Sequence, residues 1–193
     1  YYFISTFLLF VIFPLIRMIS KKFYEKNILP SLINSTCSSR PIKKQKQKVI
    51  PSAYGKVLEI GFGSGVNLQF YDKSATKKIT GVDPSEELHE LAMTNVEGID
   101  LDIELIKGSA EDLPFKDDTF DSIVCTYTLC SIPNPEIALI EISRVLKQNG
   151  KFLFAEHGLS SDKKVAKFQN FIDFFYPKIS GGCHVNRDIR SLI

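Results

Sequence analysis

Short β-branched runs alternate with segments of helical periodicity along most of this chain, starting at Lys56. The runs predict strands at residues 56–61, 77–83, 101–106, 120–129 and 151–157. The other segments predict helices at residues 64–71, 84–96, 134–150 and 161–176, the last stopped by Pro177. This alternation favours the α/β class, with a parallel sheet covered by helices on both faces. Ligands of such sheets bind at the carboxyl ends of the strands, where the strand order reverses.

A glycine-rich loop follows the first predicted strand, in the sequence LEIGFGSG. Glycine has no Cβ atom and tolerates positive φ, so Gly61, Gly63 and Gly65 would let a cofactor approach the backbone closely. A dinucleotide-binding loop has the spacing G-x-G-x-x-G, but here the sixth position is Val66. The loop therefore indicates a cofactor other than NAD.

Two acids flank this loop in the predicted fold. Glu59 is unfavourable beside a pyrophosphate, whereas it suits S-adenosylmethionine, which carries an ammonium and a sulfonium group and no phosphate. Glu59 would either contact the ammonium group or orient the loop. Asp83 closes the second strand, 18 residues after Gly65, where a carboxylate can accept both hydroxyls of a ribose. The alternative for Asp83 is a helix cap.

Four motifs in register carry a family resemblance: VLEIGFGSG, GVDPS, AEDLPFKDDTFD and ISRVLKQNGKFLFAEH. Together they resemble class I S-adenosylmethionine-dependent methyltransferases of the type 11 group, over roughly residues 56–157. The resemblance implies a Rossmann-like doubly wound parallel sheet and S-adenosyl-L-methionine as cofactor. It also implies that the cofactor-binding residues are Glu59, Gly61, Gly63, Gly65, Asp83, Ala110, Glu111, Thr126 and Tyr127, the last two near the transferred methyl. The family's sheet ends with two further strands, which a chain ending at Ile193 is expected to lack.

A narrower resemblance concerns the methyl acceptor. The stretches VCTYTLCSI, FAEHG and GGCHVNRDI are similar to the methyltransferase-like thiol methyltransferases of the endoplasmic reticulum and lipid droplets and to their bacterial relatives. This resemblance implies a small, hydrophobic acceptor such as a thiol. Two alternatives stay open: lipid or quinone methylation at a membrane, and a non-catalytic module that binds the cofactor.

Two histidines are candidate catalytic bases, although a lone histidine is more often structural. His157 ends the fifth predicted strand, and strand ends line the ligand crevice. His184 lies beside Cys183 in a glycine-rich stretch that could close over the acceptor.

Charge and cysteine content limit the partners. The net charge of +2 gives no argument for nucleic acid. The four cysteines form no CxxC pair and lack metal-ligand spacing, so we expect no metal, no disulfide framework and a cytoplasmic protein.

Three regions are expected. Residues 1–22 are apolar with a basic flank, and form either a membrane anchor or an upstream segment preceding a true start at Met18. No small-residue cleavage site follows, which disfavours a signal peptide. Residues 23–55 form a helical segment whose basic run, 40–48, is a solvated face or, with an anchor, a contact for acidic lipid headgroups. Residues 56–193 form the methyltransferase domain.

Overall fold

The computed structural model describes residues 21–193. The proposed anchor, residues 1–22, therefore lies almost wholly outside the described residues, and its alternatives stay predictions. Within residues 21–193, no helix combines the length and apolar character that crossing a membrane requires.

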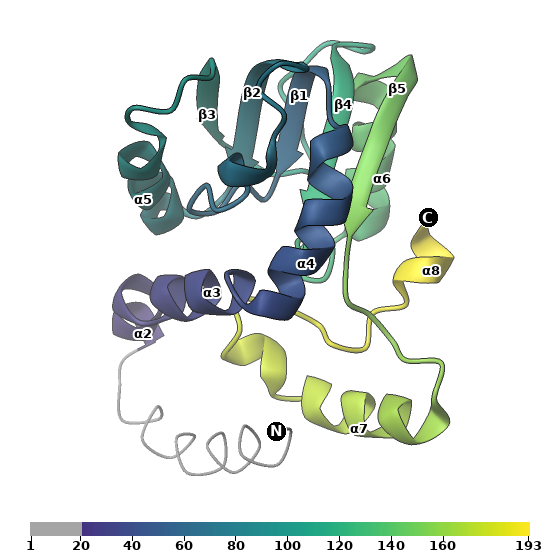
Figure 1. Ribbon diagram of the computed structural model, residues 1–193. Helices are drawn as coiled ribbons and strands as arrows, with labels where there is room; N and C mark the ends of the chain where they lie inside the picture. The colour runs from purple at the N-terminus through teal and green to yellow at the C-terminus, as the bar shows by residue number, and fades with distance from the viewer. Residues whose placement is uncertain (1–20) are drawn as a thin grey trace.

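One sheet of five parallel strands forms the centre of the described chain (Figure 1). The strands are β1 (Gly55–Ile60), β2 (Thr76–Asp83), β3 (Ile103–Lys107), β4 (Phe120–Thr126) and β5 (Leu146–Ala155). Their order is β3-β2-β1-β4-β5, so the direction of winding reverses between β1 and β4. This arrangement confirms the predicted α/β fold and puts the glycine loop after β1 beside the reversal point.

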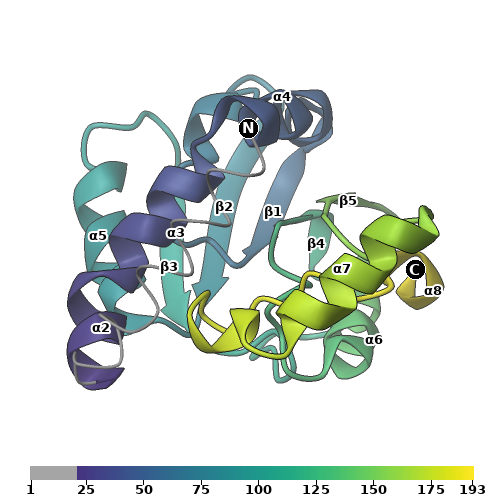
Figure 2. The ribbon, with the colours of Figure 1, turned by 90° about the horizontal axis from the view of Figure 1, so that it is seen from below.

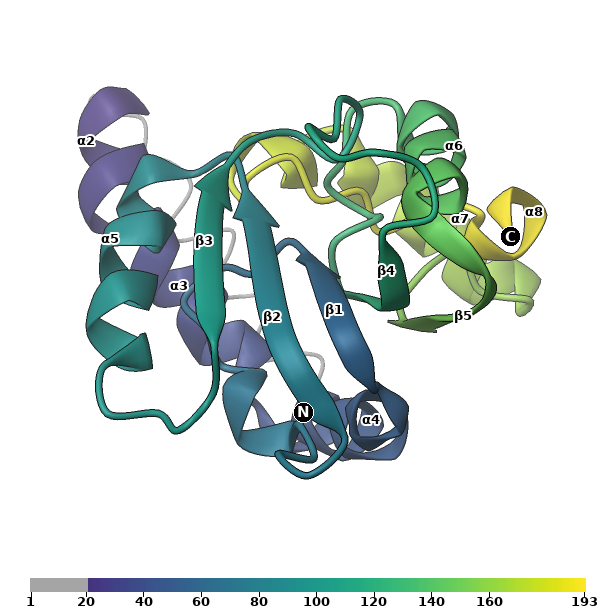
Figure 3. The same ribbon diagram turned by 90° about the horizontal axis from the view of Figure 1, so that it is seen from above.

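Helices cover both faces of this sheet (Figure 3). The α-helices are α2 (Lys21–Asn27), α3 (Leu29–Cys37), α4 (Arg40–Val49), α5 (Glu86–Val96), α6 (Pro135–Val145), α7 (Lys163–Asp173) and α8 (Ile189–Leu192). Three short 3-10 helices lie at Ile50–Ser52, Leu68–Phe70 and Tyr176–Lys178.

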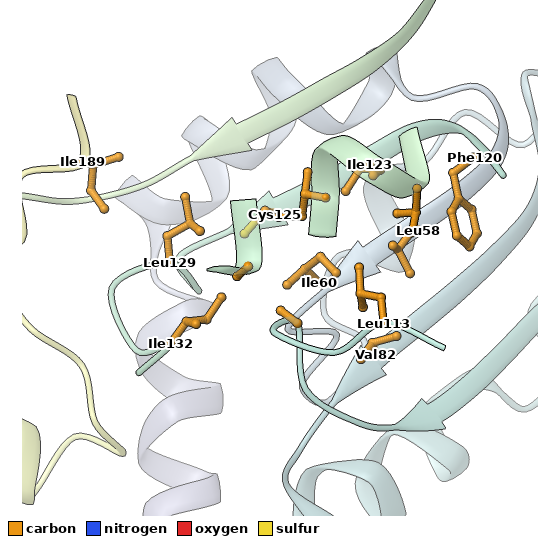
Figure 4. Packing of buried hydrophobic residues seen from close by; sticks show 14 residues of the cluster. Leu58, Ile60, Val82, Leu113, Phe120, Ile123, Cys125, Leu129, Ile132 and Ile189 are labelled. Carbon is orange, nitrogen blue, oxygen red and sulfur yellow. The ribbon is translucent and has the colours of Figure 1, made fainter. Parts of the chain in front are cut away.

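Alternation along β1 divides the core into two clusters. Leu58 and Ile60 lie in the cluster on one face (Figure 4), to which Ile142 of α6 also belongs. Val57 packs on the other face with Ala92 of α5. Each of these residues is at most 2% exposed, which is why β1 reads as a nearly continuous apolar run.

Two predicted helices differ from the structure. Helix α6 ends at Val145, several residues before the predicted end at 150, and residues 146–150 already belong to β5. The last carbonyls of the helix accept hydrogen bonds from the turn before β4. The amide of Asp118 donates to the carbonyl of Arg144 at 3.0 Å, and the amide of Thr119 donates to the carbonyl of Val145 at 2.8 Å. The segment 64–71 forms only the turn Leu68–Phe70, because the side chains around it face the buried acid described below.

Segments from both ends of the described chain lie on the side to which the strand arrows point (Figures 1 and 2). Helix α3 and helix α7 both lie there. The hydroxyl of Tyr24 donates to the carbonyl of Ile179 over 2.5 Å, which joins the two segments. Arg187 donates to the carbonyls of Leu129 and Ile132, which fixes the segment after α7 to the loop after β4.

Candidate cofactor and acceptor site

The three glycines of the loop after β1 have positive φ values of 70°, 58° and 80° for Gly61, Gly63 and Gly65. Their surroundings differ. A Cβ atom on Gly61 would overlap the side chain of Thr128, whereas one on Gly63 would meet only the carbonyl of Gly61, at 3.9 Å. The backbone at Gly63 therefore has a free face, as a loop that holds a ligand requires.

Asp83 holds this loop to the end of β2. Its Oδ2 accepts from the amide of Gly63 at 2.9 Å, and its Oδ1 accepts from the amide of Ser85 at 2.9 Å. The cap of α5 is Ser85, whose hydroxyl accepts from Leu88, so Asp83 is not the helix cap that we considered as an alternative. Each carboxylate oxygen retains a second lone pair for a ligand hydroxyl. Burial raises the pKa of Asp83.

Glu59 is fully buried and bonded to protein. Its Oε2 accepts from the hydroxyl of Tyr71 at 2.6 Å, and its Oε1 accepts from Nδ2 of Asn67 at 2.7 Å. Nδ2 of Asn67 also donates to Oγ1 of Thr126 at 3.0 Å. Burial raises the pKa of Glu59 to about 7. Of the two roles considered, these bonds favour orientation of the loop, because they tie the turn after it to the ends of β1 and β4.

Lys46 of α4 is buried, although a solvated face was expected for the basic run of residues 40–48, and its charge interacts with that of Glu59. Burial lowers its pKa, while the nearby Cys37, Glu59 and Glu156 act in the opposite direction. A neighbouring helix, α3, contacts the glycine loop directly, because Oγ of Ser64 donates to Oδ1 of Asn34 at 2.7 Å. The helices before β1 therefore form part of the site.

Ala110 and Glu111 lie in the loop after β3. Ala110 is buried, and Oε1 of Glu111 accepts from both the amide and Nδ2 of Asn134 at 2.8 Å. Glu111 thus connects the loop after β3 to the start of α6. The hydrogen bonds from Asn134 and Ser109 lower its pKa.

The ends of β4 and β5 bring Tyr127 and Glu156 to the same edge. Tyr127 has a φ of 55°, and its amide donates to Ala155 at 2.8 Å. Oε1 of Glu156 accepts from the amides of Thr128 and Leu129 at 2.7 and 3.0 Å. Its Oε2 is buried without a hydrogen-bond partner among the described residues, and burial raises the pKa of Glu156 to about 7.

The two candidate histidines lie in different surroundings. The ring of His157 is 6.2 Å from that of Tyr127, and its Nε2 is 3.2 Å from Sγ of Cys183. His184 instead pairs with Asp173 of α7, Nδ1–Oδ2 2.8 Å, and its side chain is 41% exposed. The structure thus brings His157, but not His184, next to the predicted methyl-transfer edge.

Three side chains of types that can ligate a metal meet beside this edge: Cys130, His157 and Cys183. Their ligand atoms all lie within 4.8 Å of one another. The residues come from three separate segments, so their spacing along the chain gave no indication of this cluster. All four cysteines, including Cys37 and Cys125, are free thiols in the structure.

A parallel sheet with a glycine loop fixed to an acid on the neighbouring strand defines a class of nucleoside-cofactor proteins. Comparison with known families identifies the group: the type 11 methyltransferase domain matches residues 58–154. The chain belongs to this family. Methyltransferases of this type use S-adenosylmethionine.

Three relatives are informative. The chain is 34% identical over 120 residues to the uncharacterized methyltransferase YcgJ of Bacillus subtilis, covering 61% of this chain and 47% of YcgJ. The crystal structure of YcgJ superposes with a TM-score of 0.63 at 28% identity, covering 78% of this chain and 64% of that one. Phosphatidylethanolamine N-methyltransferase of Cereibacter sphaeroides is 32% identical over 125 residues, 60% of this chain and 61% of the relative. Thiol S-methyltransferase TMT1B of Rattus norvegicus is 33% identical over 136 residues, which cover 68% of this chain and 55% of the relative.

The chain spans 47–61% of the length of these curated relatives.

Sequence reasoning missed two charged residues of the site. Glu156 directly follows the last residue of β5, and Asp83 is the last residue of β2, so the criterion that selected Asp83, an acid at the end of a strand, could have selected Glu156 as well. Lys46 had no such signal, because nothing within a run of basic residues marks the one that turns inward.

Proposed function

We propose that this chain transfers a methyl group from S-adenosylmethionine to a small, hydrophobic thiol. The observation that carries the cofactor assignment is the loop after β1, where Gly63 has a free face and is held by Asp83. The thiol assignment is supported by the similarity to a thiol S-methyltransferase.

The residues present fit the proposed cofactor. The free face at Gly63 leaves room for a ligand against the backbone, and Asp83 offers acceptors for ribose hydroxyls. Two buried acceptors, Oδ1 of Asn67 and Oε2 of Glu156, have no partner among the described residues and could accept from ligand donors. When bound, the cofactor supplies an electrophilic methyl group on a sulfonium.

Glu156 is the best placed group to take the acceptor's proton. Oε1 is engaged with two amides, whereas Oε2 is without a partner. A free thiol has a pKa of about 8.5, so an acid with a pKa near 7 is reasonably matched as a base at neutral pH. His157 is the other candidate, and its hydrogen bond with Cys130 raises its pKa.

The rest of the chain would align the two reactants and exclude water from them. Helices α3 and α7 lie over the carboxyl ends of the strands, where they would shield the reacting atoms (Figure 2). Positioning of two reactants can contribute about 7–11 kcal/mol to lowering a barrier.

Lipid methylation is the second candidate function. A phosphatidylethanolamine N-methyltransferase is among the relatives. Helix α7 and the residues after it also expose aromatic side chains, namely Phe168, Phe171 and Phe174 at 50%, 64% and 81%. Such a surface would suit an acceptor held in a bilayer.

The test is release of S-adenosylhomocysteine by the 193-residue chain from S-adenosylmethionine, with alkyl thiols of graded length in one arm. Phosphatidylethanolamine vesicles form the second arm. We expect release that depends on the thiol and grows with chain length. Release only with vesicles would replace the thiol by a lipid. Cofactor binding without release in either arm would leave a non-catalytic binding module.

A further inference from the structure

Cys130, His157 and Cys183 form a ligand cluster at the carboxyl edge of β4 and β5. Cys130 lies in the loop after β4, His157 lies two residues after the end of β5, and Cys183 belongs to the segment after α7. Of the His, Cys, Asp and Glu side chains in residues 21–193, these three form the group whose ligand atoms converge.

The distances in the cluster match those between ligands of a tetrahedral metal ion. Sγ of Cys130 and Sγ of Cys183 are 3.5 Å apart, and Nε2 of His157 is 3.2 Å from Sγ of Cys183. Zinc bonds of about 2.3 Å to sulfur and 2.0–2.1 Å to nitrogen place tetrahedral ligands about 3.8 Å apart for two sulfurs. The same bonds give about 3.6 Å for sulfur and nitrogen. For these two pairs an ion would thus require outward shifts of only a few tenths of an ångström, and the third pair, Nε2 of His157 and Sγ of Cys130, lies within 4.8 Å.

Backbone hydrogen bonds hold the ligands in place. The amide of His184, next to Cys183, donates to the carbonyl of Cys130 at 2.9 Å. The hydroxyl of Ser180 donates to the carbonyl of Cys183 at 3.2 Å. The first bond joins the two sulfur-bearing segments and the second lies within the turn that carries Cys183, so both order the site without the ion, which lowers the cost of binding one.

We propose that Cys130, His157 and Cys183 bind a zinc ion, and that its fourth position receives the thiolate of the acceptor. The second half rests on the proposed function. Three protein ligands with one open position are the arrangement of catalytic rather than structural zinc. His157 and Cys183 are half-buried, so an acceptor can reach the ion from outside.

The proposed reaction balances, and the zinc ion keeps its oxidation state throughout. The acceptor thiol loses its proton, to Oε2 of Glu156 or to water, as its sulfur binds zinc. A lone pair of that sulfur forms the new carbon–sulfur bond. The bond between the methyl carbon and the sulfonium breaks, and its electron pair stays on the cofactor's sulfur. The product thioether is neutral, binds zinc weakly and leaves.

The first experiment tests the metal alone. The 193-residue chain is kept reduced with a phosphine, because a thiol reductant would compete for the ion, and is titrated with Co²⁺. We expect one equivalent to bind with thiolate-to-cobalt absorption, and Zn²⁺ to displace it. Cys183→Ser should abolish the absorption, and His157→Gln should weaken binding at least tenfold.

Matched controls use residues outside the cluster. Cys37→Ser and His184→Asn remove a thiol and an imidazole nearby, and should leave cobalt binding unchanged. Substitution of Cys183 is preferred to that of Cys130, because Cys130 is only 2% exposed and its loss could unfold the chain. Absence of thiolate absorption in the folded wild-type chain, or absorption that survives Cys183→Ser, would overturn the metal site.

The second experiment adds an alkyl thiol to the cobalt form without S-adenosylmethionine. Stronger thiolate absorption at saturating thiol supports the open fourth position, and an unchanged spectrum overturns it. Metal-free chain that still releases S-adenosylhomocysteine with thiols would overturn the inference and leave the proposed function intact. Metal-loaded chain that binds the thiol but never releases product would leave the zinc site intact and end the proposed function.

Discussion

The amide of Gly63 donates a hydrogen bond of 2.9 Å to Oδ2 of Asp83, which joins the glycine loop to the end of the neighbouring strand. The two residues are 20 positions apart in the sequence; Gly63 lies in the loop after β1, and Asp83 is the last residue of β2. This bond fixes the backbone against which the cofactor would lie, so the acid has a structural role as well as a proposed role in binding ribose.

Replacement of Asp83 should weaken cofactor binding. Asp83→Ala leaves the amides of Gly63 and Ser85 without their acceptor and removes the acceptors for ribose. We expect the Kd for S-adenosylmethionine to rise tenfold or more, about 1.4 kcal/mol. Calorimetric titration measures it, with the exposed Asp102→Ala as control. An unchanged affinity in a folded Asp83→Ala chain would remove Asp83 from the site.

Two glycines of the loop should separate stability from binding. Gly61→Ala places a Cβ atom in the side chain of Thr128 at a positive φ, so the free energy of unfolding should fall by at least about 2 kcal/mol. Gly63→Ala has space and should cost about 1–2 kcal/mol for its φ alone.

Cofactor affinity should instead fall more in Gly63→Ala than in Gly61→Ala, because the methyl group added at Gly63 faces the ligand. Urea unfolding and cofactor titration of both variants check this contrast. Equal loss of stability in the two variants would show that Gly63 has no free face.

Stability should depend on pH through Glu59. Its pKa is about 7 in the folded chain, against about 4.3 for an exposed glutamate, so the folded chain binds this proton more tightly. The free energy of unfolding should therefore fall as pH rises from about 4.3 to about 7. Glu156 adds a contribution of the same sign.

The variant Glu59→Gln keeps the shape of the side chain and should roughly halve this slope, since Glu156 still titrates. Thermal unfolding across the pH range measures it, with the exposed Glu97→Gln as control. A slope unchanged by Glu59→Gln would mean that Glu59 is not the titrating group.

Arg144 should stabilise the loop that carries Ala110 and Glu111. Its guanidinium donates to the carbonyls of Phe115 and Leu113 at 2.7 and 3.0 Å and to Glu141. Arg144→Gln should lower the free energy of unfolding by about 1–3 kcal/mol. Urea unfolding measures the loss, and the exposed Arg190→Gln is expected to be near neutral. Equal stability of the two variants would contradict this role.

The sequence predicted the central strands β1, β2 and β4 well because they are largely buried on both faces. Runs such as residues 56–61 are apolar on two sides and end in a glycine or an acid, so both their position and their functional end can be recognised. The end of α6 was predicted less well, because the pairing of Leu146 with Phe120 of β4, which starts β5 directly after the helix, is a tertiary effect.

The candidate site also has a part that the sequence predicted and a part that it did not. Gly61, Gly63, Gly65 and Asp83 lie at strand ends, where topology converts sequence order into proximity. The cluster of Cys130, His157 and Cys183 depends on how the segment after α7 returns to the loop after β4. No spacing of residues along the chain predicts this contact between the two segments, and none predicts that the side chain of Lys46 is buried.

Direct titration of the 193-residue chain with S-adenosylmethionine tests the central claim. The account predicts saturable binding of one equivalent, no binding of NAD, and an affinity lowered tenfold or more by Asp83→Ala. Absence of binding by a folded chain, or binding unaffected by Asp83→Ala, would contradict the assignment of the loop after β1 as the cofactor site.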